Sequence, residues 1–169
     1  PVMKNITLLG VLSGLTAVTP LGAQTISQRC SGDEYRAFDF WLGEWNVVNR
    51  AATTANPQVA VNRISLASDG CALREEYSNG TYSGTSLSYY DATSQQWRQT
   101  WVDNQGASII MAGTVWENSL SMSWRANGAG HRLTWTLLDT GQVRQHWERS
   151  EDDGRTWTTV FDGRYTKRE

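Results

Sequence analysis

The chain from residue 44 onward is divided into ten short runs rich in β-branched and aromatic residues, separated by turn-forming residues at nearly regular intervals. No helical period is sustained after residue 45, so the pattern predicts a meander of strands. Asp69-Gly70, Asn79-Gly80 and Asp139-Thr140-Gly141 tolerate the positive φ that tight hairpins require. Longer connections are expected at 51–57 and 125–130. The predicted strands are 44–49, 58–68, 71–77, 82–90, 96–103, 107–116, 119–124, 131–138, 142–150 and 156–166.

The number of predicted strands favours a closed sheet. An open sheet of this size leaves two unpaired edges, whereas closure removes both edges and encloses a space wide enough for one small ligand. We therefore predict an all-β fold, an up-and-down antiparallel β-barrel of about ten strands. A β-sandwich is the alternative, because short alternating strands fit both architectures. Residues 38–42 are expected to form a short helical turn that plugs one barrel end.

The N-terminal residues have the composition of an export signal. Met3-Lys4 gives a short positive start, residues 6–18 form an apolar run, and residues 20–23 offer a small-residue cleavage site. A membrane anchor is the alternative, but it needs about 20 apolar residues. We therefore expect a periplasmic or secreted protein without stable membrane insertion. The expected parts are a signal peptide at 1–23, an N-terminal segment at 24–37 and a barrel domain at 38–169.

The two cysteines of the chain, Cys30 and Cys71, predict a disulfide. An even pair in a small exported protein is most simply bonded, and this bond would tie the N-terminal segment to the barrel. Two separate buried thiols are the alternative, because the sequence does not give the distance between them. Two Cys and two distant His lack zinc-like spacing, so we expect no metal site.

The net charge argues against nucleic acid as a partner, and the tryptophan content predicts an aromatic interior. A net charge of −2 with both signs interspersed gives no reason to expect nucleic acid as a partner. Nine tryptophans in 169 residues are unusual. Each carries a large apolar surface and one N–H donor, so the chain is expected to have an aromatic core, an aromatic-lined pocket, or both.

The opening Gly43-x-Trp45, with Arg164 in the last predicted strand, resembles the calycin superfamily, in which such a tryptophan is capped by a basic residue of the closing strand. The resemblance implies structural roles for Gly43, Trp45 and Arg164. Longer motifs resemble a bacterial family of exported, calycin-like proteins of unknown function and cover most of the mature chain. This family implies no catalytic residue, and the glycine-richer opening of related haem barrels is missing, so no cofactor is expected. The motifs are Phe38-Asp39-Phe40-Trp41-x-Gly43-x-Trp45, Gly70-Cys71-x-Leu73-x-Glu75, Trp97-x-Gln99-x-Trp101-Val102-Asp103 and Asp152-x-Gly154-x-Thr156-Trp157.

Alternation within the predicted strands places three polar residues among inward-facing apolar ones: Glu75, Gln99 and Gln145. We interpret them as the few polar groups of an apolar pocket that binds a small hydrophobic or aromatic molecule. The alternative is a filled core in which Glu75 pairs with an arginine. The candidate ligand-binding residues are Glu75, Tyr77, Trp97, Gln99, Trp101, Trp124, Trp135, Gln145 and Trp147.

The sequence leaves open whether the protein is an enzyme. It has no nucleophile elbow or phosphate loop, and its two histidines, His131 and His146, are predicted to be surface residues. The best enzymatic hypothesis uses a buried Glu75 as general acid or base, with Asp103 as the only obvious second carboxylate. This hypothesis is the first alternative to simple binding.

The segment 150–157 resembles the Asp-box hairpin of sugar-active propellers. A propeller repeats its blades, and this segment occurs once, so we predict a structural turn. A carbohydrate-binding or interaction module is the second functional alternative. It would need several tryptophans on one outer face, whereas the alternation places most of them inside.

Overall fold

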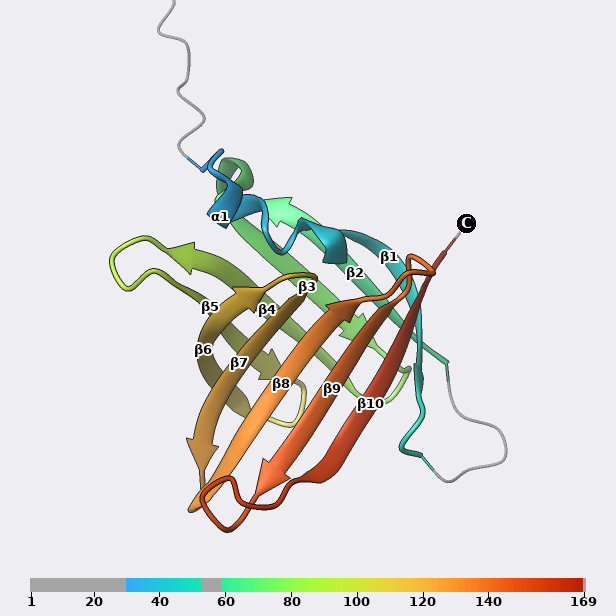
Figure 1. The fold of residues 1–169 in the computed structure, drawn as a ribbon. Helices are drawn as coiled ribbons and strands as arrows, with labels where there is room; N and C mark the ends of the chain where they lie inside the picture. The colour runs from blue at the N-terminus through green and yellow to red at the C-terminus, as the bar shows by residue number, and fades with distance from the viewer. Residues whose placement is uncertain (1–29, 53–58, 169) are drawn as a thin grey trace, which may run out of the picture.

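The computed structural model of the protein describes residues 30–52 and 59–168, which form a closed barrel (Figure 1). Each strand pairs antiparallel with the next, and β1 pairs with β10 from Trp45–Lys167 to Asn49–Gly163 to complete the ring. The predicted ten-stranded up-and-down barrel is confirmed and the sandwich alternative is wrong. The predicted signal peptide lies outside the described residues. The strands are β1 Gly43–Asn49, β2 Val59–Ala67, β3 Ala72–Ser78, β4 Ser83–Asp91, β5 Gln96–Asp103, β6 Ser108–Trp116, β7 Ser119–Ala126, β8 Ala129–Leu137, β9 Val143–Ser150 and β10 Thr158–Lys167.

The observed strands begin and end within two residues of the predicted ones. The expected long connection at 125–130 is wrong, because β7 and β8 meet in a tight turn at Asn127-Gly128. Asn127 has φ 51° and Gly128 has φ 80°, as a two-residue hairpin requires. Asn-Gly is a strong signal for a tight hairpin, and here it determines the connection although the polar residues around it suggested a longer loop.

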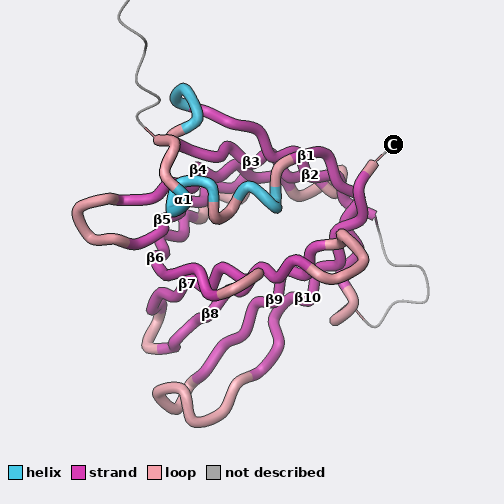
Figure 2. Tube along the Cα trace, turned by 45° about the horizontal axis from the view of Figure 1, so that its top comes forward, coloured by secondary structure: helices cyan, strands magenta, loops and turns pink. Residues whose placement is uncertain are grey.

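The chain ahead of β1 covers one end of the barrel, here called the closed end (Figure 2). It contains the helix α1 Asp33–Arg36, which the sequence did not predict, and the 3₁₀ turn η1 Asp39–Trp41, which confirms the expected plug. Phe38 is the centre of its packing: the ring stacks on Trp41 at 4.9 Å between centroids and meets Trp135 edge-on at 5.3 Å. All three side chains are fully buried, so this end is a packed aromatic core.

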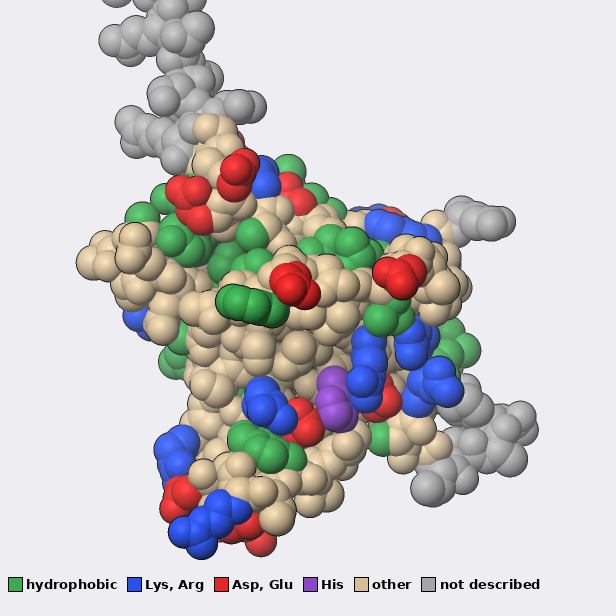
Figure 3. Space-filling model, in the orientation of Figure 1, with side chains coloured by type: hydrophobic (Ala, Val, Ile, Leu, Met, Phe, Trp, Pro, Cys, Tyr) green, Lys and Arg blue, Asp and Glu red, His purple; other side chains and the backbone are tan. Residues whose placement is uncertain are grey.

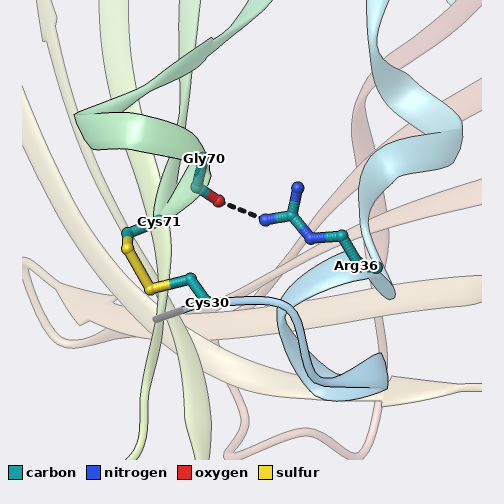
Figure 4. The surroundings of a disulfide bond; sticks show 4 residues. All are labelled: Cys30, Arg36, Gly70 and Cys71. Carbon is teal, nitrogen blue, oxygen red and sulfur yellow. Dashed lines mark hydrogen bonds between the residues drawn. A yellow bond between two sulfur atoms is a disulfide. The ribbon is translucent and has the colours of Figure 1, made fainter. Parts of the chain in front are cut away.

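Cys30 and Cys71 form a disulfide, which confirms the predicted pairing and excludes the separate thiols (Figure 4). The bond ties the start of the described chain to the turn between β2 and β3 across a sequence separation of 41. Arg36 donates a hydrogen bond to the carbonyl oxygen of Gly70 beside it. The plug is therefore attached to the barrel wall both covalently and by a hydrogen bond.

The basic residue over Trp45 is Lys167, so the role implied for Arg164 is wrong. Lys167 pairs directly with Trp45 across β1 and β10, and its Nζ lies 4.0 Å from the ring centroid. Side chains alternate along a strand, so Lys167 shares the inward parity of Tyr165, whereas Arg164 points the other way and pairs with Val48. The predicted structural roles of Gly43 and Trp45 remain compatible with the structure, since Gly43 has φ 129° and Trp45 is fully buried.

The outer face of β8, β9 and β10 carries charged side chains of both signs (Figure 3). Cross-strand pairs join Arg132 to Glu148 at 2.8 Å and Arg144 to Asp162 at 2.7 Å. In residues 30–52 and 59–168, no helix has the length and hydropathy needed to cross a membrane.

Candidate functional site

The half of the barrel away from the plug, here called the open end, contains a cavity of about 530 Å³. Its wall is formed by residues of β1, β3 and β5 to β10 and by residues of the adjoining loops, whereas β2 and β4 contribute none. The plug residues of α1 and η1 are absent from its wall. Its lining residues are Val47, Asn49, Ala52, Glu75, Tyr77, Asn79, Tyr82, Gln99, Trp101, Asp103, Ala107, Ile109, Met111, Trp124, Leu133, Gln145, Trp147, Phe161 and Tyr165.

The structure brings seven of the nine candidate ligand-binding residues to this cavity. They are Glu75, Tyr77, Gln99, Trp101, Trp124, Gln145 and Trp147. Trp97 and Trp135 face inward as predicted but lie in the packed closed end, with exposures of 2% and 0%. Trp97 donates its Nε1–H to the carbonyl oxygen of Glu34 in the plug. Alternation along a strand therefore identified the inner face, but it could not tell the filled half from the hollow half.

Glu75 on β3 is a buried carboxyl group in the cavity wall, with 4% exposure. Its Oε1 accepts a hydrogen bond from Asn62 Nδ2 and its Oε2 accepts one from Ser86 Oγ, both at 2.7 Å. No arginine or lysine among the described residues forms an ion pair with it, in contrast to the arginine partner of the filled-core alternative. Burial raises the pKa of Glu75 to about 7, although the hydrogen bonds from Ser86 and Asn62 oppose this rise.

The hydrogen bonds around Glu75 continue across the barrel to β9. Asn62 Nδ2 also lies 3.5 Å from the hydroxyl of Tyr165, and this hydroxyl donates to Gln145 Oε1. Burial, and then the charge of Glu75, raises the pKa of Tyr165 well above its ordinary value, so its hydroxyl keeps its proton. Gln99 is held separately, by donation from its Nε2 to Ser88 Oγ at 2.8 Å. The polar groups of the wall are thus fixed by neighbours before any ligand is present.

An aromatic cluster next to Glu75 forms one side of the cavity. The ring centroid of Trp101 lies 6.4 Å from that of Tyr77 and 6.3 Å from that of Tyr82. The Trp101 ring lies across β4 at Gly84, where a Cβ atom would come within 2.1 Å of it. Gly84 is therefore needed for the position of the Trp101 ring.

Asp103 provides a second carboxylate at the rim of the cavity. Its Oδ1 accepts backbone N–H bonds from Gln105 and Ala107, and its Oδ2 accepts from the Tyr82 hydroxyl at 3.1 Å. Desolvation raises the pKa of Asp103, but these hydrogen bonds outweigh it and leave the pKa below its ordinary value. Asp103 is therefore ionised near neutral pH, whereas Glu75, with a pKa of about 7, is only partly ionised there.

His131 is buried, so its predicted surface position is wrong. Its ring stacks on Trp124 of the neighbouring strand at 4.8 Å, with 9° between the planes, and its Nδ1 accepts a hydrogen bond from Trp147 Nε1 at 3.1 Å. Burial, and then the charge of Arg149, lowers the pKa of His131. A neutral imidazole on the inner face of β8 therefore contacts two tryptophans of the cavity wall.

The Asp-box segment forms the structural turn between β9 and β10, as predicted. Asp152 accepts from the backbone N–H and the hydroxyl of Thr156 at 2.8 and 2.7 Å, and from Ser150 Oγ at 2.8 Å. These hydrogen bonds lower the pKa of Asp152 to about 2. Trp157 packs under Arg132, whose Cζ lies 4.4 Å from the ring centroid. None of these residues lines the main cavity.

Sequence reasoning missed several residues of the site, notably Asn62, Ser86, Phe161 and Tyr165. Asn62 had the same signal as Gln99, a polar side chain between the inward-facing Ala60 and Ile64. Phe161 was harder to place, because an irregularity between Thr159 and Phe161 shifts the register of β10.

In residues 30–52 and 59–168, no three His, Cys, Asp or Glu side chains lie close enough together to hold a metal ion. No protein-family model matches the chain, and no curated protein matches it.

Proposed function

We propose that the barrel binds a small, largely aromatic or apolar molecule in the cavity of its open end. The observation that carries this proposal is the cavity itself, whose volume of about 530 Å³ falls in the range of small-molecule sites. Its wall combines aromatic rings with a few polar groups that are already held in place, namely Glu75, Gln99 and Gln145. Such a wall buries an apolar body and orients one polar end of it.

The proposed setting is the periplasm or the outside of the cell. The disulfide between Cys30 and Cys71 supports it, because such bonds persist in oxidising compartments. The closed barrel and the cation over Trp45 support a calycin-like relationship, although the cation comes from Lys167. We therefore keep an exported, lipocalin-like binding protein as the proposal.

Native mass spectrometry of the protein purified from its own host tests this proposal directly. A stoichiometric small molecule that is released on denaturation is the expected result. A protein that carries no ligand, and that takes up none from lipid or aromatic metabolite pools, would contradict it.

Fluorescence titration with the neutral aromatic probe N-phenyl-1-naphthylamine tests the location of the site. Gly84→Ala displaces the Trp101 ring from the wall, and Trp101→Ala removes it, so both variants are expected to bind the probe about tenfold more weakly. Gly130→Ala is the matched control, since a Cβ there meets nothing closer than 4.0 Å. Equal affinity in all variants would place the probe elsewhere.

A second candidate function is general acid–base catalysis by Glu75. Its pKa of about 7 favours this candidate, because a catalytic acid or base works best with a pKa near the working pH. The test is turnover of the molecule found by mass spectrometry. A catalytic Glu75 predicts that Glu75→Gln abolishes turnover while the neutral probe binds as before.

A further inference from the structure

The charges in the cavity wall all have one sign. Glu75 and Asp103 are its two carboxyl groups, and no lysine, arginine or histidine is found among the described residues that line it. Two cations on the inward parity do not line the cavity: Lys167 covers Trp45 at the closed end, and Arg149 lies opposite His131 near the end of β9. A ligand that enters the cavity therefore meets negative charge and no compensating positive charge.

Glu75 keeps acceptor capacity toward the cavity. Each carboxylate oxygen has two lone pairs, and Asn62 and Ser86 occupy one on each oxygen. The remaining lone pairs have no donor among the described residues, while the side chain contributes to the cavity wall. Ionised Glu75 is costly in this position unless a positive charge comes close to it.

Aromatic rings around this carboxyl group favour the same kind of ligand. Tyr77, Tyr82 and Trp101 lie within 6.4 Å of one another by ring centroid, and Trp124 and Trp147 line the same cavity. The faces of tryptophan and tyrosine attract ammonium groups, and aromatic walls with a carboxylate are suited to organic cations. An anionic ligand would be opposed by both features.

We infer that the ligand is an organic amine, an aromatic or apolar body that carries a protonated nitrogen, and that its ammonium group pairs with Glu75. This inference rests on the proposed binding function and names its ligand class. When the ammonium group binds, protonated Glu75 releases its proton to solvent and the carboxylate pairs with the cation. The ligand thus supplies the positive charge that the barrel wall lacks.

Three probes with one ring system test the ligand class: 1-naphthylmethylamine, 1-naphthylmethanol and 1-naphthoate, which are cationic, neutral and anionic near pH 7. The amine is expected to bind about 10- to 100-fold more tightly than the alcohol, and the carboxylate most weakly. Glu75→Gln is expected to remove the preference for the amine, so that the amine binds no more tightly than the alcohol. Glu76→Gln is the matched control, because Glu76 is the next residue and lies on the outer face, paired with Arg74 at 3.0 Å.

Proton release from the wild-type protein gives a second readout that needs no variant. Calorimetry near pH 6.5 in buffers of different ionisation enthalpy is expected to show release of a large fraction of one proton with the amine and none with the alcohol. The titratable groups that face Glu75 are Tyr77 on its own strand and Tyr165 on β10. Burial raises the pKa of both, so neither loses a proton near pH 6.5, and the contacts from β2 and β4 are the non-titrating Asn62 and Ser86.

The outcomes separate this inference from the function on which it rests. Equal affinity for amine and alcohol without proton release would overturn the amine assignment and leave ligand binding intact. The amine assignment is also overturned, with ligand binding left intact, if Glu76→Gln removes the preference for the amine as fully as Glu75→Gln does. Failure of the wild-type protein to bind any of the three probes would overturn the inference and count against the proposed function as well.

Discussion

The closed and open ends of the barrel have inner faces of the same aromatic character, but only the closed end is filled. At the closed end, Phe38 and Trp41 enter from the plug and pack against Trp135, all fully buried. At the open end, Trp101 and Trp147 line a cavity. The comparison shows that an aromatic inner face does not decide between core and pocket. The segment ahead of β1 decides it, by filling one half of the barrel.

A pair of tryptophan substitutions tests this difference with the largest expected effect. Trp135→Ala removes a fully buried ring from the closed end and is expected to lower the free energy of unfolding by about 3–5 kcal/mol. Trp101→Ala enlarges an existing cavity, so we expect a loss of about 1 kcal/mol together with weaker probe binding. Urea unfolding measures both. Equal losses from the two variants would contradict the division into a filled and a hollow half.

The attachment of the plug gives the next largest effect. Cys30→Ser combined with Cys71→Ser is expected to lower the free energy of unfolding by about 2–4 kcal/mol, because it removes a cross-link over a sequence separation of 41. Denaturant unfolding under oxidising conditions measures this loss. Reductant should destabilise the wild-type protein to the same level and leave the variant unchanged. If reductant leaves the denaturant midpoint of the wild-type protein unchanged, the hydrogen bonds and packing of the plug are sufficient to hold it on the barrel.

Glu75 at the open end is expected to make the free energy of unfolding depend on pH. The pKa of Glu75 is about 7 in the folded barrel and 4.5 in the reference state, so the folded protein binds the proton more tightly. Its contribution to stability is therefore fully present below pH 4.5 and is lost as the pH rises to 7, by about 3 kcal/mol in total. The buried His131 has a lowered pKa and acts in the opposite direction, with its contribution present above pH 6.5 and lost as the pH falls.

Comparison of the wild-type protein with Glu75→Gln isolates the contribution of Glu75 to the pH dependence of the free energy of unfolding. The difference in free energy of unfolding between the wild-type protein and Glu75→Gln is expected to change between pH 4.5 and 7, since the effect of His131 is common to both. The difference measured with Glu76→Gln should stay flat over the same range. A flat difference for Glu75→Gln would show that its carboxyl group is ionised throughout.

The smallest expected effect concerns the cation at the closed end. Lys167→Met removes the ammonium group that lies 4.0 Å from the ring centroid of Trp45. We expect a loss of about 0.5–1 kcal/mol in the free energy of unfolding, as for other exposed cation–aromatic contacts. Arg168→Met, on the adjacent residue, is the control and should change stability less. A larger loss from the control would assign the stabilising role to Arg168.

The sequence predicted the barrel well because its signals are local. Alternation within each run and Gly-, Asn- or Asp-containing turns give strand bounds within two residues. The filled and hollow halves depend instead on contacts between distant segments, such as Phe38 with Trp135, which no local period encodes. For the same reason alternation identified Glu75 as inward-facing but could not identify Asn62 and Ser86 as its partners.

The basic residue over Trp45 and the position of His131 were missed for different physical reasons. The pairing of β1 with β10 sets which basic residue faces Trp45, and this register places Lys167 opposite it. His131 looked like an isolated polar residue near a strand end, yet its ring is paired with Trp124 from the neighbouring strand and accepts from Trp147 of the next. Both features require cross-strand register, which the sequence alone does not specify.

The pairing of β1 with β10 also has a consequence for how the protein folds. Every other strand pair joins neighbours in sequence, so each can form as a hairpin while the chain is still open. Ring closure instead brings Trp45 together with Lys167, which lies near the C-terminal end of the chain. The entropy of closing so long a loop makes this the slowest pairing to form, so we expect the open meander to be the last species before the native barrel. Until then both terminal strands are unpaired edges, and aggregation competes with closure.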